Sequence, residues 1–215
     1  MAATLSVKTN NGKKVMLNRT YSASPSFTTP SKFKLYINST VPTVGTTDIT
    51  TSIPFNGVEA IDTCDVTTGW TASASDSVSL NTTNYVEGVG ALNLIKAATG
   101  TTLSTSSKTT TSLNFTSKTL YAFIYVSTTL YATINATGAI IIRFGSDSSN
   151  YYQYSVDKAD IAVGWNIISF TSATATSTVG SPVIASCDYT LIGYNTTNNA
   201  DVTVAGDFIY DNLQL

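Results

Sequence analysis

The fold is decided by the stretch Ala139-Ile140-Ile141-Ile142-Arg143-Phe144-Gly145, which a polar turn separates from Tyr151-Tyr152-Gln153-Tyr154-Ser155-Val156. A third run, Trp165-Asn166-Ile167-Ile168-Ser169-Phe170, follows a second turn. β-Branched and aromatic residues dominate all three runs and turn-forming residues bound them, which is typical of β-strands. We expect these strands to form a meander with one face toward a core. Strands from the rest of the chain would cover that face as a second sheet, so the residues predict an all-β sandwich.

Composition excludes several kinds of chemistry. Charged residues make up 11% of the 215 residues, against about 25% in ordinary soluble domains. The chain contains no histidine, and so lacks the usual general base near neutral pH and the commonest metal ligand. The only glutamates, Glu59 and Glu87, lie near turns, where a solvated or cation-binding role is expected rather than glycoside hydrolysis. We therefore expect a protein that is not an enzyme.

The N-terminal sequence, the apolar runs and the net charge indicate where the chain folds and which partners it lacks. It begins Met1-Ala2-Ala3-Thr4, without the basic and apolar regions of a secretory signal. No apolar run approaches the roughly 18 residues that a membrane helix needs. The net charge of −2 gives no general attraction to nucleic acid or to a membrane surface. We expect a chain that folds in a host cytoplasm, with neither nucleic acid nor membrane as a partner.

The first quarter of the chain is basic and the remainder is acidic. Residues 1–58 carry six basic side chains against one acidic, a charge of +5, while residues 59–215 carry five basic and twelve acidic, a charge of −7. This split indicates different partners for the two parts. The candidate anchoring residues are Lys13, Lys14, Lys32 and Lys34. The alternative is a chance clustering of charges on a solvated strand pair.

Residues 1–57 are expected to form a small extended or hairpin module. Leu5-Ser6-Val7-Lys8 and Val15-Met16-Leu17 flank an Asn11-Gly12 pair, the strong signal for a tight hairpin turn. The prolines that follow favour extended chain over helix. Because apolar residues are sparse here, we expect that this module does not fold alone. The boundary is placed near Gly57, with the sandwich spanning residues 58–215.

This first part resembles a known group of proteins. The motifs are Val15-Met16-Leu17-Asn18-Arg19-Thr20-Tyr21, Pro30-Ser31-Lys32-Phe33-Lys34-Leu35 and Val41-Pro42-Thr43-Val44. They resemble the opening of tailed-phage structural proteins, in which a short N-terminal module precedes a sandwich domain. The resemblance covers about a quarter of the chain and implies a place in a virion.

Four motifs mark the second part of the chain: Gly69-Trp70, Gly88-Val89-Gly90-Ala91-Leu92, Gly164-Trp165-Asn166-Ile167-Ile168 and the ending Asp207-Phe208-Ile209-Tyr210-Asp211-Asn212-Leu213-Gln214-Leu215. They resemble motifs of jelly-roll carbohydrate-binding modules and of laminin-G or concanavalin-like domains. The resemblance implies an antiparallel jelly-roll β-sandwich over residues 58–215. It says little about the ligand, because this fold hosts many functions.

Polar and aromatic residues at turns are candidates for binding sugars, since an exposed ring stacks on a sugar and a neighbouring Asp or Asn holds its hydroxyls. The candidate carbohydrate-binding residues are Asp147, Asn150, Tyr151, Tyr152 and Trp70. The alternative for Trp70 is a place in the core, where aromatic residues supply much of a sandwich's packing, and this is what we expect for Trp165. Tyr151 alternates with Tyr152 and is expected to be exposed on the opposite face.

Related jelly rolls hold a structural Ca²⁺ where the first and last strands meet. The resemblance therefore implies a site made of Asp62 and Asp65 in the first strand, Glu87 in the next turn and Asp211 in the closing strand. Ca²⁺ takes six to eight oxygens, and carboxylates gathered without a cation repel one another. Asn212, not an acid, follows Asp211. The alternative is that these are separate surface carboxylates.

The two cysteines, Cys64 and Cys187, leave two possibilities open. One is a disulfide that joins the sheet edges. The other, expected for a chain that folds in a cytoplasm, is two buried free thiols.

Two functional hypotheses follow. The first is a non-enzymatic structural protein of a phage virion, decorating the head or associated with the tail. Its N-terminal part would dock on other virion proteins, its sandwich would face outward, and it would form a homo-oligomer in the particle. The second is a carbohydrate-binding or receptor-binding module that adheres to cell-surface glycans.

Overall fold

The computed structural model describes residues 5–8, 14–17, 59–98 and 101–215. The chain divides into two compact units, Met1–Asn56 and Gly57–Leu215. In the first unit, β1 (Leu5–Lys8) pairs antiparallel with β2 (Lys14–Leu17), as in the expected hairpin. Of the anchoring lysines, Lys13, Lys32 and Lys34 lie outside the described residues, and Lys14 lies in β2 with its side chain not described. The anchoring role stays a prediction.

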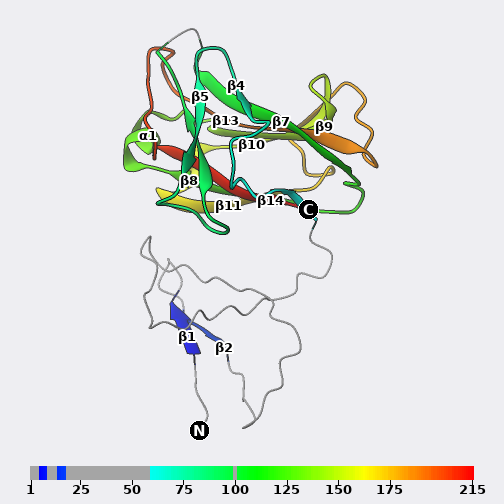
Figure 1. Cartoon of the computed structure of the whole chain (residues 1–215), viewed down its shortest axis with the longest axis horizontal. Helices are drawn as coiled ribbons and strands as arrows, with labels where there is room; N and C mark the ends of the chain where they lie inside the picture. Colours follow the sequence, from blue (N-terminus) through cyan, green and yellow to red (C-terminus); the bar gives the residue numbers. More distant parts are fainter. Residues whose placement is uncertain (1–4, 9–13, 18–58, 99–100) are drawn as a thin grey trace. The chain divides into compact units, whose positions relative to one another are not determined.

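The second unit is an antiparallel jelly-roll β-sandwich of two sheets, and this confirms the expected fold class (Figure 1). Sheet I has the strand order β12-β10-β9-β13-β7-β4. Its strands are β4 (Thr71–Ala72), β7 (Leu103–Leu113), β9 (Ile140–Asp147), β10 (Asn150–Val156), β12 (Ser177–Val179) and β13 (Cys187–Asn195). Sheet II has the order β11-β8-β14-β6-β5, with β3 also paired to β14. Its strands are β3 (Ala60–Asp62), β5 (Ser77–Asn81), β6 (Ala91–Ile95), β8 (Leu120–Val126), β11 (Gly164–Phe170) and β14 (Phe208–Gln214).

The three strand-forming runs are present, but they do not form one meander. β9 and β10 pair as a hairpin in sheet I, with Phe144 opposite Tyr152. β11 instead pairs with β8 in sheet II, with Ile168 opposite Ala122. The 3₁₀ turn η1 (Lys158–Asp160) and the buried Ile161 carry the chain across the edge of the core between β10 and β11. The strand pattern was therefore predictable, but the change of sheet depended on this connection.

The core lies between the sheets and is built from the alternate, inward-facing positions of both. Phe115, in the loop between β7 and β8, packs into this core with its ring centroid 5.3 Å from Phe144 and 5.8 Å from Phe170. The inward residues of β8 and β9 are fully buried: Leu120, Ala122, Ile124, Val126, Ile140, Ile142 and Phe144. The intervening residues of each strand therefore form the two outer faces of the sandwich.

One short helix, α1 (Thr128–Thr133), lies between β8 and β9. Ser127 caps it: its hydroxyl oxygen accepts from the Leu130 amide and its hydroxyl donates to Asp207. Within the described part of the chain, no helix has the length and apolar character needed to cross a membrane.

Cys64 and Cys187 are free thiols, and both are fully buried. Burial raises the pKa of the Cys187 thiol to about 11, so it stays protonated at neutral pH. The structure therefore agrees with the second of the two possibilities, buried free cysteines without a disulfide.

Candidate functional site

The outer face of sheet I carries a cluster of one arginine and two tyrosines. Because Ile142 and Phe144 enter the core, Arg143 between them points to the opposite side of the sheet. Tyr151 on β10 and Tyr189 on β13 both lie in register with Gly145, one on each side of β9. We call Arg143, Tyr151, Gln153 and Tyr189 the tyrosine face.

Gly145 brings the two tyrosine rings together. Two strands on either side of a third lie roughly 9–10 Å apart, yet the ring centroids of Tyr151 and Tyr189 are 6.4 Å apart. The rings therefore lean toward each other across the glycine. A Cβ at Gly145 would lie 2.2 Å from the Asn150 carbonyl oxygen and 2.4 Å from the Tyr151 Cα, so no larger residue fits without a backbone shift.

Arg143 is held in one orientation. Its guanidinium carbon lies 4.6 Å from the centroid of the Tyr151 ring, and its Nε donates to Gln153 Oε1 at 2.8 Å. Gln153 in turn donates to the hydroxyl of Ser155. No carboxylate in the described part of the chain lies within ion-pair distance of Arg143. The guanidinium is thus a fixed donor on the Tyr151 ring, with no carboxylate to neutralise it among the described residues.

The electrostatics keep Tyr189 in its neutral form. Burial raises the pKa of Tyr189, and the nearby Arg143 charge opposes that rise. A neutral phenol both donates and accepts hydrogen bonds. The tyrosine face therefore combines flat apolar surface with hydroxyl, amide and guanidinium groups, and this combination suits a hydroxylated ligand.

The predicted carbohydrate-binding residues are only partly brought together. Asp147 and Asn150 lie at the exposed turn between β9 and β10, at the rim of the tyrosine face. Asn150 Nδ2 donates to both carboxylate oxygens of Asp147, which lowers the pKa of that carboxyl, and Asn150 Oδ1 accepts from the Ser181 amide. Tyr151 does point away from the core, but it is only 8% exposed because Arg143 and Tyr189 lie against it.

Tyr152 and Trp70 correct the expectation, because both rings pack on the core side. The Tyr152 ring lies 5.9 Å from Phe115, as the alternation along β10 requires. Trp70 is 7% exposed, with its ring centroid 4.9 Å from that of Tyr210. Trp165 was expected in the core, but it is half-buried on the outer face of sheet II, next to Tyr125.

The four expected Ca²⁺ ligands have separate partners. Asp62 forms an ion pair with Lys108 and accepts from the Cys64 amide. Asp65 accepts from the Val89 and Gly90 amides. Among the described residues, no group of three or more Asp, Glu, Cys or His side chains is placed to hold a metal ion. Any cation here would need backbone carbonyls for most of its ligands, and the Ca²⁺ site stays a prediction.

Asp211 is the member of that set with an unused oxygen. Its Oδ2 accepts from the Val86 and Glu87 amides at 2.6 and 3.1 Å, while the fully buried Oδ1 has no hydrogen-bond partner. Burial raises the pKa of Asp211 to about 7, despite the opposing amide hydrogen bonds. Either a proton or a cation would satisfy Oδ1, so Asp211, beside the Glu87 carboxylate, is where a cation would be held.

Sequence reasoning missed Tyr189, Gly145, Arg143 and Gln153 as site residues. Alternation along β9 and β10 was enough to place Arg143 and Gln153 on the same face as Tyr151. Tyr189 could not be found in this way, because its position depends on the register of β13 with β9, and β13 lies more than forty residues away in the sequence.

No protein-family model and no curated protein matches the chain. A family 11 carbohydrate-binding module from Clostridium thermocellum, solved with a β-1,3-1,4-mixed-linked tetrasaccharide, is 14% identical with a TM-score of 0.49, and the match covers 74% of this chain and 94% of that one. A xylan-binding domain of family 22 from Paenibacillus barcinonensis is 14% identical with a TM-score of 0.38, over 73% and 90%. An exo-β-agarase is 12% identical with a TM-score of 0.47, over 72% of this chain and 24% of the enzyme. Likenesses at this level assign neither a ligand nor an activity to this chain.

Proposed function

We propose that this chain is a non-catalytic carbohydrate-binding module that binds glycans on the tyrosine face. The observation that carries the proposal is the fixed guanidinium of Arg143, which lies against the Tyr151 ring and near Tyr189 and has no carboxylate partner among the described residues. The half-buried guanidinium has no ion-pair partner among these residues, and it keeps N–H donors that a ligand can reach.

Sugars fit this chemistry. The C–H groups on one side of a pyranose ring pack on an aromatic side chain, while its hydroxyls need donors and acceptors in the ring plane. Tyr189 supplies half-exposed aromatic surface and a hydroxyl, and Arg143 supplies N–H donors beyond the one that Gln153 accepts. Because the donors are already oriented, binding orders few side chains.

Binding without catalysis is also what the carboxylates support. Glycoside hydrolysis needs two carboxyl groups facing each other across the bond to be cleaved. Within the described chain, the carboxylate at the rim of the tyrosine face is Asp147, and it is engaged by Asn150 and by the Ser149 amide. The tyrosine face thus has groups for holding a sugar and no acid–base pair.

The virion role remains a separate proposal. It rests on motifs in residues 1–57, which lie almost entirely outside the described residues, so the expected partners and homo-oligomer stay predictions. A virion protein with a glycan-binding sandwich would combine both hypotheses. Purified particles would be tested for a stoichiometric amount of this chain, and its absence from them would leave the glycan-binding proposal intact.

The carbohydrate proposal is tested by a glycan array followed by titration calorimetry with the full chain. Tyr189→Ala and Arg143→Ala should each weaken binding by about tenfold or more, since they remove central contacts. Tyr121→Ala is the matched control, because Tyr121 is 39% exposed on the opposite sheet. Retention of full affinity by both tyrosine-face variants, or the lack of any glycan ligand, would contradict the proposal.

A further inference from the structure

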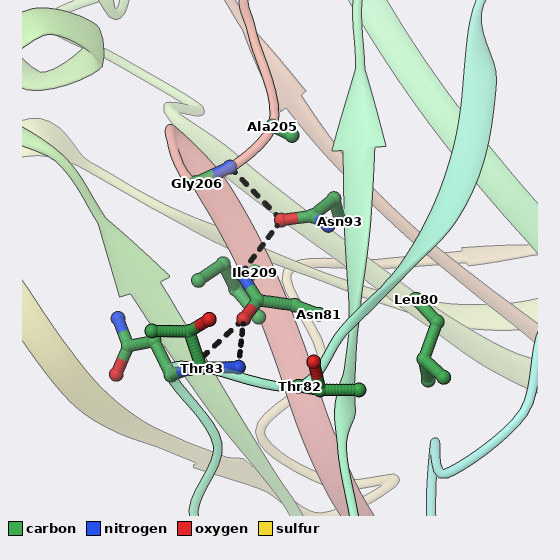
Figure 2. Close-up of a pocket in the computed structure, with 9 residues that line it drawn as sticks. Leu80, Asn81, Thr82, Thr83, Asn93, Ala205, Gly206 and Ile209 are labelled. Atoms are coloured by element: carbon green, nitrogen blue, oxygen red, sulfur yellow. Dashed lines mark hydrogen bonds between the residues drawn. The ribbon is translucent and has the colours of Figure 1, made fainter.

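A hollow lies on the outer face of sheet II, opposite the tyrosine face, and we call it the asparagine groove. It has a volume of about 410 Å³, within the usual range of small-ligand sites of roughly 300–1,000 Å³. Its lining comes from β5 and the turn after it, from β6, and from the start of β14: Leu80, Asn81, Thr82, Thr83, Asn84, Asn93, Ala205, Gly206 and Ile209. Figure 2 shows these side chains around the groove. None of them carries a charge.

The groove is built around Asn93. This amide is 2% exposed, and its Oδ1 accepts from Asn81 Nδ2 at 3.0 Å and from the Gly206 amide at 2.9 Å (Figure 2). Its Nδ2 donates to the hydroxyl of Ser79. The hydrogen bonds join β5, β6 and the turn before β14, so the two walls are held at a fixed separation.

One wall is fixed in the same way. Asn81 Oδ1 accepts from the Thr83 and Asn84 amides at 3.0 and 2.8 Å, which locks the turn after β5 (Figure 2). Asn84 Oδ1 accepts from Trp165 Nε1 at 2.9 Å. The ring of Trp165 is thereby tied to the groove, and its other neighbour is Tyr125, in an edge-to-face contact with centroids 5.6 Å apart.

The groups left over point to a ligand. Asn84 Nδ2 and the hydroxyls of the exposed Thr82 and Thr83 have no hydrogen-bond partner among the described residues, so a ligand can bind them in place of water. Trp165, Tyr125 and Ile209 lie in one cross-strand row with Asn93 at its end. The half-buried rings of Trp165 and Tyr125 therefore lie beside the groove and are tied to it by the hydrogen bond to Asn84, while Ile209 and Asn93 of the same row are buried.

We infer that the asparagine groove is a second carbohydrate-binding site, specific for an uncharged sugar. Neutral amides and hydroxyls match sugar hydroxyls without the desolvation cost that a charged lining would impose. The same lack of cations leaves a uronic or sialic acid carboxylate without a partner, so acidic sugars are disfavoured. This site does not rest on the tyrosine face, because the two lie on opposite sheets and share no residue.

The two tryptophans make the test specific. In ¹⁵N spectra of the full chain each indole N–H gives one signal, and Trp70, buried beside Tyr210, is the internal control for Trp165. The neutral probes are the β-1,3-1,4-mixed-linked glucotetraose, xylohexaose and mannohexaose, and the charged comparison is trigalacturonate. We expect at least one neutral probe to shift the Trp165 indole and the Thr83, Asn84 and Gly206 amides, with the Trp70 indole unmoved.

Two variants separate this site from the tyrosine face. Thr83→Lys places a cation and extra bulk at an exposed position of the groove, and it should weaken the binding of the neutral probe by about tenfold. Tyr189→Ala should leave the Trp165 shift intact, whatever it does to binding on sheet I. The inference is overturned if no neutral probe shifts the Trp165 indole at about 10 mM, or if Tyr189→Ala abolishes the shift.

Discussion

The two outer faces of the sandwich have the same architecture and opposite chemistry. On sheet I, the outward positions of β9, β10 and β13 place the Arg143 cation against the Tyr151 ring, and Gly145 lets the Tyr151 and Tyr189 rings approach each other. On sheet II, the outward positions of β5, β6 and β14 place neutral amides around a hollow, with Trp165 at its side. The inward positions of both sheets are mostly apolar, with the buried Ser104, Ser106 and Thr190 as polar exceptions on sheet I. The comparison shows that the core determines the fold, while every second residue is free to determine what is bound.

The faces also differ in how they are kept rigid. The tyrosine face depends on the contact of the Arg143 guanidinium with the Tyr151 ring, on the tilted contact between the Tyr151 and Tyr189 rings, and on the hydrogen bond from Arg143 to Gln153. The sheet II side depends on side chains that bind backbone amides, at Asn81, Asn93, Asp65 and Asp211. We therefore expect substitutions of these four sheet II side chains to lower stability more than substitutions of Arg143 or Tyr189 do.

The largest effect is expected at Asp211. Its pKa is about 7 in the folded chain and near the ordinary 3.8 in the unfolded chain, so the native state binds the proton more tightly. The contribution of this group to stability therefore falls as pH rises between these two values, by up to about 4 kcal/mol in total. Asp211→Asn keeps an oxygen for the Val86 and Glu87 amides and does not ionise. The Asp211→Asn variant should therefore keep most of the stability that the parent chain loses between pH 5 and pH 8, as measured by urea unfolding at each pH.

Asp147→Asn is the control for that experiment, because the lowered pKa of Asp147 keeps it ionised throughout this pH range. The parent chain and the Asp211→Asn variant also test whether Asp211 binds Ca²⁺. At pH 8, Ca²⁺ should raise the melting temperature of the parent chain and EDTA should lower it, with Asp211→Asn insensitive to both. Equal melting temperatures of the parent chain in Ca²⁺ and EDTA would leave a proton as the only partner of Asp211 Oδ1.

Gly145→Ala should have the next largest effect, and it should lower both the stability of the chain and its glycan affinity on sheet I. The added Cβ meets the Asn150 carbonyl and the Tyr151 backbone, so β9 and β10 must separate, at a cost of about 1–3 kcal/mol. The tyrosine rings then move apart and glycan affinity on sheet I falls, while the asparagine groove is unchanged. Melting curves and calorimetry on folded protein measure the two effects.

Gly193→Ala is the matched control on the same sheet. A Cβ there would lie 2.4 Å from the Ser104 carbonyl oxygen, so a similar loss of stability is expected, but Gly193 lies in register with Ile141 and not with the tyrosines. If both variants lose glycan affinity equally, general destabilisation explains the loss and the ring geometry does not.

These faces show what the sequence could and could not predict. Alternation in Tyr151 to Val156 predicted correctly which residues face inward, because that signal is local. The partner of Tyr151 could not be predicted, because Tyr189 reaches it through the register of a distant strand. Trp165 was expected in the core because aromatic residues supply much of a sandwich's packing, but its register with Tyr125 places it half-buried on the outer face of sheet II. For the anchoring lysines, the prediction concerns residues 1–57 and stays open.

The smallest expected effect tests whether the charge of Arg143 makes the two faces prefer different ligands. Arg143 is half-buried and unpaired among the described residues, so a sugar carboxylate that reaches it would gain about 0.2–1 kcal/mol, as in exposed ion pairs. Trigalacturonate should therefore bind the tyrosine face up to about fivefold more tightly than a neutral trisaccharide, and added salt should remove this difference because it screens the pair. Arg143→Gln should remove it too, and should leave the neutral sugar in the asparagine groove unaffected by salt. A salt-independent preference for the acidic sugar, retained in Arg143→Gln, would show that the charge of Arg143 does not select the ligand.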